Sequence, residues 1–427
     1  MTGIRPLYLT VRICAVIFLL LCLSPRLSTA RDLTGFVEGS YGAALQGTKA
    51  DNNGYNLGEL RGQVKYSYFP VFLDAYAGEV YIKAEALADG YRNTFSTEVR
   101  EANLFLSPVE RMDIKAGRQV LTWGTGDLIF INDLFPKDYI SFFSGRDEEY
   151  LKRPSDAARF MFWGEWLNTD LVITPVMEAN ESLRGRRLSF YDGLRRSIEG
   201  ERIGRGFEEP VRTPRNLELA LRLYRTFGSV EAAAYYYRGF YKQPRGIRDP
   251  ARELFFYPRL SVYGASLRGP LAGGIANAEF GYYDSRQDSS GRAGSIENSS
   301  VKYLLGYTRD LGGDLKLGLQ YYIEQTLDYG NYRAALGAGE PASDRLRSML
   351  TFRLTRLYMA QTLRAGIFVF YSPTDEDAYL RPAVGYDISD ALKVTVGANI
   401  FTGNQDHTEF GQLEYNDNVY ARVRYSF

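Results

Sequence analysis

Residues 314–324 read DLKLGLQYYIE, and this stretch decides the fold. Leu315, Leu317, Leu319, Tyr321 and Ile323 occupy every second position, with mostly polar or small residues between them. Successive side chains of a β-strand point to opposite faces, whereas helical faces repeat every 3.6 residues. The stretch therefore predicts a β-strand with one apolar and one polar face.

The same alternation recurs along most of the chain, and short turns alternate with longer polar loops between the segments. A soluble sandwich or propeller would not need such uniformly long strands or one uniformly short rim. We predict an all-β fold, a transmembrane antiparallel up-and-down barrel of about eighteen strands. An alternative of about sixteen strands stays open because the segments near Ala158–Trp163 and Val230–Tyr241 do not alternate cleanly.

The N-terminal segment has the features of a secretory signal peptide. Arg5 and Arg12 precede an apolar run over residues 13–23, and small residues at 28–30 suit a cleavage site. The run is about half of the ~20 residues that a spanning helix needs. We predict a signal peptide over residues 1–30 and an outer-membrane barrel over 31–427, located in the bacterial outer membrane. The alternatives are an N-terminal anchor and a lipoprotein site.

The composition disfavours an enzyme. Both cysteines, Cys14 and Cys22, fall in the signal segment, and His407 is the sole histidine. Without Arg5, Arg12 and Arg26 of the signal segment, 48 of the 51 basic residues remain, against 51 acidic residues. A slightly acidic chain lacks the excess of positive charge that is typical of nucleic-acid-binding proteins. We predict no enzymatic activity, no cofactor and no metal. Acidic clusters at 147–149 and 375–377 are the alternative calcium sites.

The charged face of each strand is expected to line the lumen, because a Lys or Arg facing lipid at mid-bilayer costs about 2–4 kcal/mol. The alternative is a lumen closed by Arg–Glu pairs. Glu79, Glu85, Glu279 and Asp314 share this face. The predicted pore-lining residues are Arg61, Lys65, Lys83, Arg118, Arg222, Lys316, Arg353, Arg422, Arg424, Glu59, Glu218 and Glu324.

Two connections are too long to be simple turns. Leu121–Asp156 mixes aromatic and charged residues, and we expect it to fold into the barrel and narrow the lumen. Met177–Pro214 is rich in arginine; it is either a lipopolysaccharide-binding outer loop or a positive mouth that attracts anions. The predicted constriction residues of the first loop are Phe130, Phe135, Lys137, Tyr139, Arg146, Lys152 and Arg153.

One local motif resembles a known family. The run GRQVLTWGTGDL at Gly117–Leu128, preceded by REANLFL at Arg100–Leu106, resembles the alginate-export and related Gram-negative porin families. The resemblance implies an eighteen-stranded outer-membrane barrel with an arginine-lined conduit for anionic saccharides. Arg118 and Gln119 match the family run. Arg118 lies on an otherwise apolar face, so we expect it at a bulge or at the base of the loop.

The chain ends on an amphipathic strand with a terminal aromatic, Phe427. We predict that this strand closes the barrel against the strand near Leu33–Leu45, and that Phe427 is a signal to the barrel-assembly machinery. The predicted function is a porin or exporter for passive passage of small polar or anionic solutes, anionic saccharides among them. A non-conducting barrel, as scaffold or sleeve for a partner, is the alternative. Expected partners are outer-membrane lipids and lipopolysaccharide.

Overall fold

A computed structural model describes residues 33–46, 54–200 and 205–427. The predicted signal peptide and Arg202 lie outside the described residues. Eighteen strands form one sheet. They are β1(Leu33–Ala44), β2(Tyr55–Tyr68), β3(Glu79–Asp89), β4(Thr94–Val109), β5(Met112–Val120), β6(Pro154–Phe162), β7(Asn168–Thr174), β11(Glu218–Phe227), β12(Val230–Phe240), β15(Arg259–Leu271), β16(Gly274–Ser285), β17(Ser300–Asp310), β18(Leu315–Thr326), β19(Leu346–Tyr358), β20(Leu363–Ser372), β21(Asp377–Asp387), β22(Leu392–Gly403) and β23(Asn418–Ser426).

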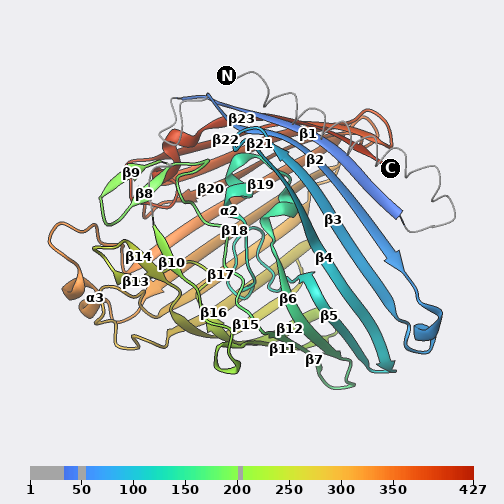
Figure 1. Ribbon diagram of the computed structural model, residues 1–427, viewed down its shortest axis with the longest axis horizontal. Coiled ribbons are helices and arrows are strands. Elements are labelled where there is room, and N and C mark those ends of the chain that lie inside the picture. Colours follow the sequence, from blue (N-terminus) through green and yellow to red (C-terminus); the bar gives the residue numbers. More distant parts are fainter. Residues whose placement is uncertain (1–32, 47–53, 201–204) are drawn as a thin grey trace, which may run out of the picture.

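The sheet closes on itself. Each strand pairs antiparallel with the next, and β23 pairs with β1 from Ser426 opposite Phe36 to Asn418 opposite Ala44. Figure 1 shows the blue first strand beside the red last strand. Closure leaves no sheet edge with unpaired backbone groups, as a hydrocarbon environment requires. The prediction of an eighteen-stranded barrel is confirmed. The sixteen-strand alternative is wrong, because β6 and β12 are full members of the sheet.

The two faces of the strands differ as their alternation predicts. In β18, Leu319 and Tyr321 are 44% and 40% exposed, whereas Gln320 and Tyr322 are each 7% exposed. The accessible row is apolar and lies on the outside, and the covered row faces the interior. Outward apolar side chains are suited to lipid, and inward polar ones to a lumen.

Short turns join the strands at one end, called here the turn end. Longer segments join them at the other, the loop end, where Figure 1 shows the small sheets and α3. Two strand boundaries differ from expectation. Asp156 belongs to β6, so the first long loop is 121–153, and Asp314 lies in the turn before β18 with a φ of 58°. The smaller elements are η1(Val71–Tyr76), α2(Tyr139–Ser144), η2(Glu148–Leu151), β8(Phe190–Asp192), β9(Ser197–Glu199), β10(Gly206–Glu208), η3(Pro214–Asn216), β13(Gly246–Asp249), β14(Leu254–Phe256), α3(Tyr329–Ala335) and η4(Gly411–Asn416).

No helix among the described residues is long and apolar enough to cross a membrane.

Candidate functional site

The loop 121–153 runs inside the barrel. Its Tyr150 hydroxyl donates to Glu85 on β3 at 3.3 Å, and its Asp127 N–H donates to Gln320 on β18 at 2.7 Å. Its Gly126 N–H donates to Glu279 on β16 at 2.7 Å. A segment that bonds to strands spread around a closed barrel lies within the bore. Figure 1 shows α2, the helix of this loop, between the strands.

Aromatic packing fixes α2 against the wall. The Phe142 ring lies 5.7 Å from the Tyr379 ring and 6.2 Å from the Phe370 ring, and Phe143 lies 5.7 Å from Phe401. The guanidinium of Arg381 lies 4.1 Å from the centre of the Phe142 ring. Edge-to-face aromatic pairs contribute about 0.5–1.5 kcal/mol each beyond their buried area. The apolar side of the loop is therefore an anchor.

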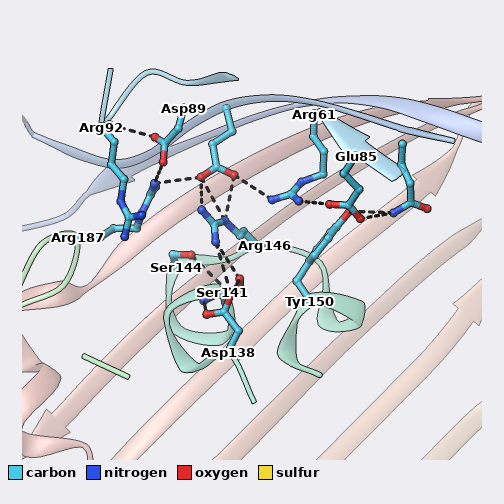
Figure 2. A network of polar contacts seen from close by, with 12 residues as sticks. Arg61, Glu85, Asp89, Arg92, Asp138, Ser141, Ser144, Arg146, Tyr150 and Arg187 are labelled. Carbon is cyan, nitrogen blue, oxygen red and sulfur yellow. Dashed lines mark hydrogen bonds and ion pairs between the residues drawn. The ribbon is translucent and has the colours of Figure 1, made fainter. Parts of the chain in front are cut away.

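A buried ionic network fixes the segment that follows α2. Glu59 of β2 accepts Arg146 at 2.5 Å and pairs with Arg187 of the second long loop at 3.1 Å. Arg187, fully buried, also pairs with Asp89 of β3. Figure 2 shows Arg146 and Arg187 meeting the strand carboxylates from the loop side. Each buried charge has an opposite charge, as burial demands.

The network continues along the wall to η2. Arg61 donates to Glu85 at 2.6 Å and lies 3.9 Å over the Tyr150 ring. Arg100 donates to the carbonyl oxygens of Glu149 and Lys152 at 3.0 and 2.7 Å. These contacts hold both ends of η2 against β2–β4. We call the residues Glu59, Arg61, Glu85, Asp89, Arg100, Arg146, Tyr150 and Arg187 the buried network.

Burial dominates the electrostatics of the two loop arginines. Burial lowers the pKa of Arg187 to about 10, with Arg146 adding to the effect and Glu59 opposing it. Burial also acts to lower the pKa of Arg146, but Glu59 outweighs it and the pKa is raised. Both side chains are charged at neutral pH. Their role is to hold two loops on one pair of strands.

A second charged zone faces the lumen. Five wall cations, Lys83, Arg353, Arg381, Arg422 and Arg424, form what we call the basic wall. They pair with four carboxylates of the loop, Asp127, Asp147, Glu148 and Glu149, which we call the loop acids. The pairs are Arg353–Asp127 at 2.8 Å, Arg353–Glu148 at 3.3 Å, Arg381–Glu148 at 3.1 Å, Arg422–Asp147 at 2.9 Å, Arg424–Asp147 at 3.4 Å, Arg424–Glu149 at 3.8 Å and Lys83–Glu149 at 3.3 Å.

The loop acids are more accessible than the cations they meet. The side chain of Glu148 is 45% exposed, whereas that of Arg381 is 11% exposed. Burial raises the pKa of Asp127, with Arg353 opposing the shift. Burial acts the same way on Asp147, but Arg422 and Arg424 outweigh it and the pKa is lowered. A solute in the lumen thus meets partly exposed carboxylates that are held by cations fixed on the wall.

Several predicted lumen residues form pairs away from the loop acids. Arg222 pairs with Glu231 at 2.6 Å, and Glu218 pairs with Lys242 at 2.6 Å. Glu324 pairs with Lys302 at 3.1 Å. One of them is an Arg–Glu pair and two are Lys–Glu pairs, and each joins neighbouring elements of the wall. In the part of the chain that the structure describes, Lys65 and Lys316 form no ion pair.

The predicted constriction residues divide into two groups. Phe135 and Lys137 are buried within the loop, where Lys137 pairs with Asp133 at 2.9 Å and lies over Phe130. Tyr139 stacks on Phe143 at 6.1 Å. These residues hold the loop together. Lys152 donates to Thr122 at 2.6 Å, and Arg153 pairs with Glu178 and Glu181 at 3.2 Å, so both brace the loop base.

Arg118 lies at the base of the loop. It follows Gly117, whose φ of 123° is open only to glycine, since a Cβ there would meet the Ala102 carbonyl oxygen at 2.3 Å. Arg118 pairs with Glu98 at 3.4 Å and with Asp156 at 3.5 Å. None of its ion pairs is with the loop acids.

Three arginines of the second long loop are paired with carboxylates. Arg187 is buried in the network, Arg205 pairs with Asp192 at 2.7 Å, and Arg195 pairs with Glu253 at 2.7 Å. The expected positive mouth is therefore corrected at these three positions. Carboxylates from nearby strands and loops neutralise them.

Sequence reasoning missed Arg381 and Asp127, and it interpreted residues 147–149 as a possible calcium cluster. Arg381 follows Tyr379 at strand spacing, which was an available signal. Among the described residues, no three His, Cys, Asp or Glu side chains are grouped to hold a metal ion. In the second acidic cluster, Asp375 pairs with Arg347, and Asp377 accepts the Phe410 N–H at 2.8 Å.

Comparison with known proteins identifies the fold. No protein-family model and no curated relative matches the sequence. Among solved structures, OccAB3 of Acinetobacter baumannii matches with a TM-score of 0.55 at 11% identity, over 93% of this chain and 98% of that chain. OccD3 (OpdP) of Pseudomonas aeruginosa matches with a TM-score of 0.53 at 12% identity, over 93% and 91%. The chain has the fold of the outer-membrane porins of Gram-negative bacteria.

Proposed function

We propose that the protein is a passive outer-membrane channel for small polar or anionic solutes, narrowed by the loop 121–153. The observation that carries the proposal is the pairing of the partly exposed loop acids with the basic wall. Guanidinium groups bind carboxylates and phosphates through paired hydrogen bonds. The cations are fixed on strands, whereas the acids sit on a loop, so a solute carboxylate competes with the loop acids for the same arginines.

We infer that the protein is secreted across the inner membrane and that its barrel lies in the outer membrane. Residues 1–30 direct secretion and residues 31–427 insert in the outer membrane, in contact with its lipids. Structural neighbours of this fold are channels rather than enzymes. The terminal Phe427 pairs with Gly35 through two backbone hydrogen bonds of 2.9 and 3.0 Å, which supports a role for the last strand in barrel assembly.

Conductance in planar bilayers tests the channel. We expect stable ohmic steps, larger steps after deletion of the α2–η2 segment, and an anion-favouring reversal potential in a salt gradient. Arg422→Gln with Arg424→Gln should reduce the anion preference, whereas Arg222→Gln, which removes the same kind of charge away from the loop acids, should change it little. A barrel without conductance would instead be the scaffold alternative. Cation preference in the unmodified protein would refute the anionic solute class.

A further inference from the structure

Three arginines gather on the outer surface of the barrel at the loop end of β12, β15 and β16. Tyr237 points inward, where its hydroxyl donates to Glu218 at 2.6 Å, so the adjacent Arg238 points outward. Arg238 lies opposite Ser261, which shares a strand face with Arg259 two residues away. The Arg286 N–H donates to the Arg259 carbonyl oxygen at 3.1 Å. The three positions are thus neighbours on one outer patch.

The patch carries a net positive charge. Arg238 is exposed, and Arg259 donates to the amide oxygen of Asn216 at 2.8 Å. Within residues 33–46, 54–200 and 205–427, none of the three arginines forms an ion pair, although Asp284 lies nearby. Burial lowers the pKa of Arg286, and the positive charges of Arg238 and Arg259 add to the effect. Three arginines with one carboxylate, Asp284, beside them leave the patch net positive, which favours an anionic ligand.

A row of tyrosines lies directly below the patch. The Tyr236 and Tyr263 rings are 5.3 Å apart, and the Tyr263 and Tyr282 rings are 6.2 Å apart. The three tyrosines are cross-strand neighbours on β12, β15 and β16. Each lies two or four residues nearer the turn end than the arginine of its strand or of the residues that follow it. Tyrosines on the outside of a membrane barrel mark the boundary of the hydrocarbon layer. The arginines therefore lie at the level of the lipid headgroups.

We propose that Arg238, Arg259 and Arg286 bind the phosphate groups of an outer-leaflet lipid headgroup. Arginine binds phosphate through paired, charge-assisted hydrogen bonds. The patch faces the membrane rather than the lumen, and the apolar wall below it offers acyl chains a surface, with Leu267 53% exposed. The proposal assumes the outer-membrane location but not channel activity, so a protein without conductance still binds the lipid.

Native mass spectrometry of the purified, delipidated protein tests this site. The probe is bisphosphorylated lipid A, compared with the same lipid after removal of its phosphates. The test variant carries Arg238→Gln, Arg259→Gln and Arg286→Gln. The matched control carries Arg225→Gln, Arg309→Gln and Arg356→Gln, which removes three arginines near the turn end. Heat-modifiable migration on gels verifies that each variant is folded. If the triple variant does not fold, Arg238→Gln alone replaces it as the test variant.

We expect the test variant to bind the phosphorylated lipid about tenfold more weakly or worse, and the control to bind like the unmodified protein. Removal of the phosphates should have the same effect as removal of the arginines. Equal binding by test variant and unmodified protein overturns the proposal. The proposal is also overturned if inorganic phosphate, at the same phosphate concentration, displaces the lipid. That result would make the patch a site for soluble anions.

Discussion

At the scale of single residues, Arg187 joins parts of the chain that are far apart in sequence. It brings the second long loop onto Glu59 and Asp89, the same strand pair that holds Arg146 of the first loop. Its guanidinium also donates to the Asn56 carbonyl oxygen at 2.5 Å. One side chain thus couples the positions of two loops to the wall.

Replacing Arg187 with methionine should destabilise the protein strongly. Removing one member of a buried ion pair leaves the other charge uncompensated, which costs about 3–5 kcal/mol. The measurement is the urea midpoint of unfolding in lipid vesicles. Arg195→Met is the control, because Arg195 is 43% exposed and pairs at the surface. Equal losses for both variants would contradict the structural role of Arg187.

Asp127 should make ion selectivity depend on pH. Its raised pKa means that the folded protein favours the neutral carboxyl, so its contribution to stability is complete below the ordinary pKa and is lost as pH rises through the raised value. On acidification Asp127 becomes neutral at a higher pH than an ordinary aspartate and leaves Arg353 partly unpaired. We expect the anion preference of the channel to increase in this pH range. The measurement is the reversal potential as a function of pH. Asp127→Asn should remove this step; a step that persists would point to another group.

At the scale of elements, the loop 121–153 is a separately anchored unit inside a wall that pairs without it. The ladders of the barrel strands involve no residue of α2 or η2. Loop and wall meet through the rings around Phe142 and through the buried network. The loop can therefore be loosened without opening the barrel.

Phe142→Ala should detach α2 and leave the barrel folded. Truncation of a buried phenylalanine costs about 3–5 kcal/mol, and here the loss falls on loop docking. We expect noisier single-channel currents and faster proteolysis within 121–153, with unchanged heat-modifiable migration. Phe352→Ala is the matched control, because Phe352 faces outward on β19. If both variants leave the currents quiet, α2 is not held by this anchor.

Sequence reasoning predicted the elements better than their contacts. The alternation in β18 is local, so Leu319 and Gln320 were assigned to opposite faces from neighbouring residues alone. The pairing of Arg353 with Asp127 depends on how a loop docks on a distant strand, and no local pattern encodes that. For the same reason the sequence places Arg187 only within an arginine-rich loop, either lipopolysaccharide-binding or a positive mouth, whereas its partners Glu59 and Asp89 are buried on β2 and β3.

At the scale of the whole molecule, the barrel depends on one seam between the two ends of the described chain. β1 and β23 pair over the whole of β23, and beyond it Phe427 exchanges two backbone hydrogen bonds with Gly35. The Phe427 ring lies over Gly35, where a Cβ would come within 2.7 Å of the ring and 2.4 Å of the Gln63 carbonyl oxygen. Glycine at position 35 thus makes room for the terminal aromatic ring.

Gly35→Ala should slow closure of the barrel more than it changes the finished channel. The added methyl group must displace either the Phe427 ring or the β1–β2 ladder, and such overpacking costs about 1–3 kcal/mol. Gly39→Ala is the control on the same strand face, since a Cβ there meets nothing within 4 Å. The measurement is the rate at which heat-modifiable protein forms in vesicles, followed by single-channel conductance of the folded fraction. We expect slow folding with normal conductance for Gly35→Ala, the same pattern for deletion of Phe427, and neither effect for Gly39→Ala. If Gly35→Ala folds as fast as Gly39→Ala, the seating of Phe427 does not control closure.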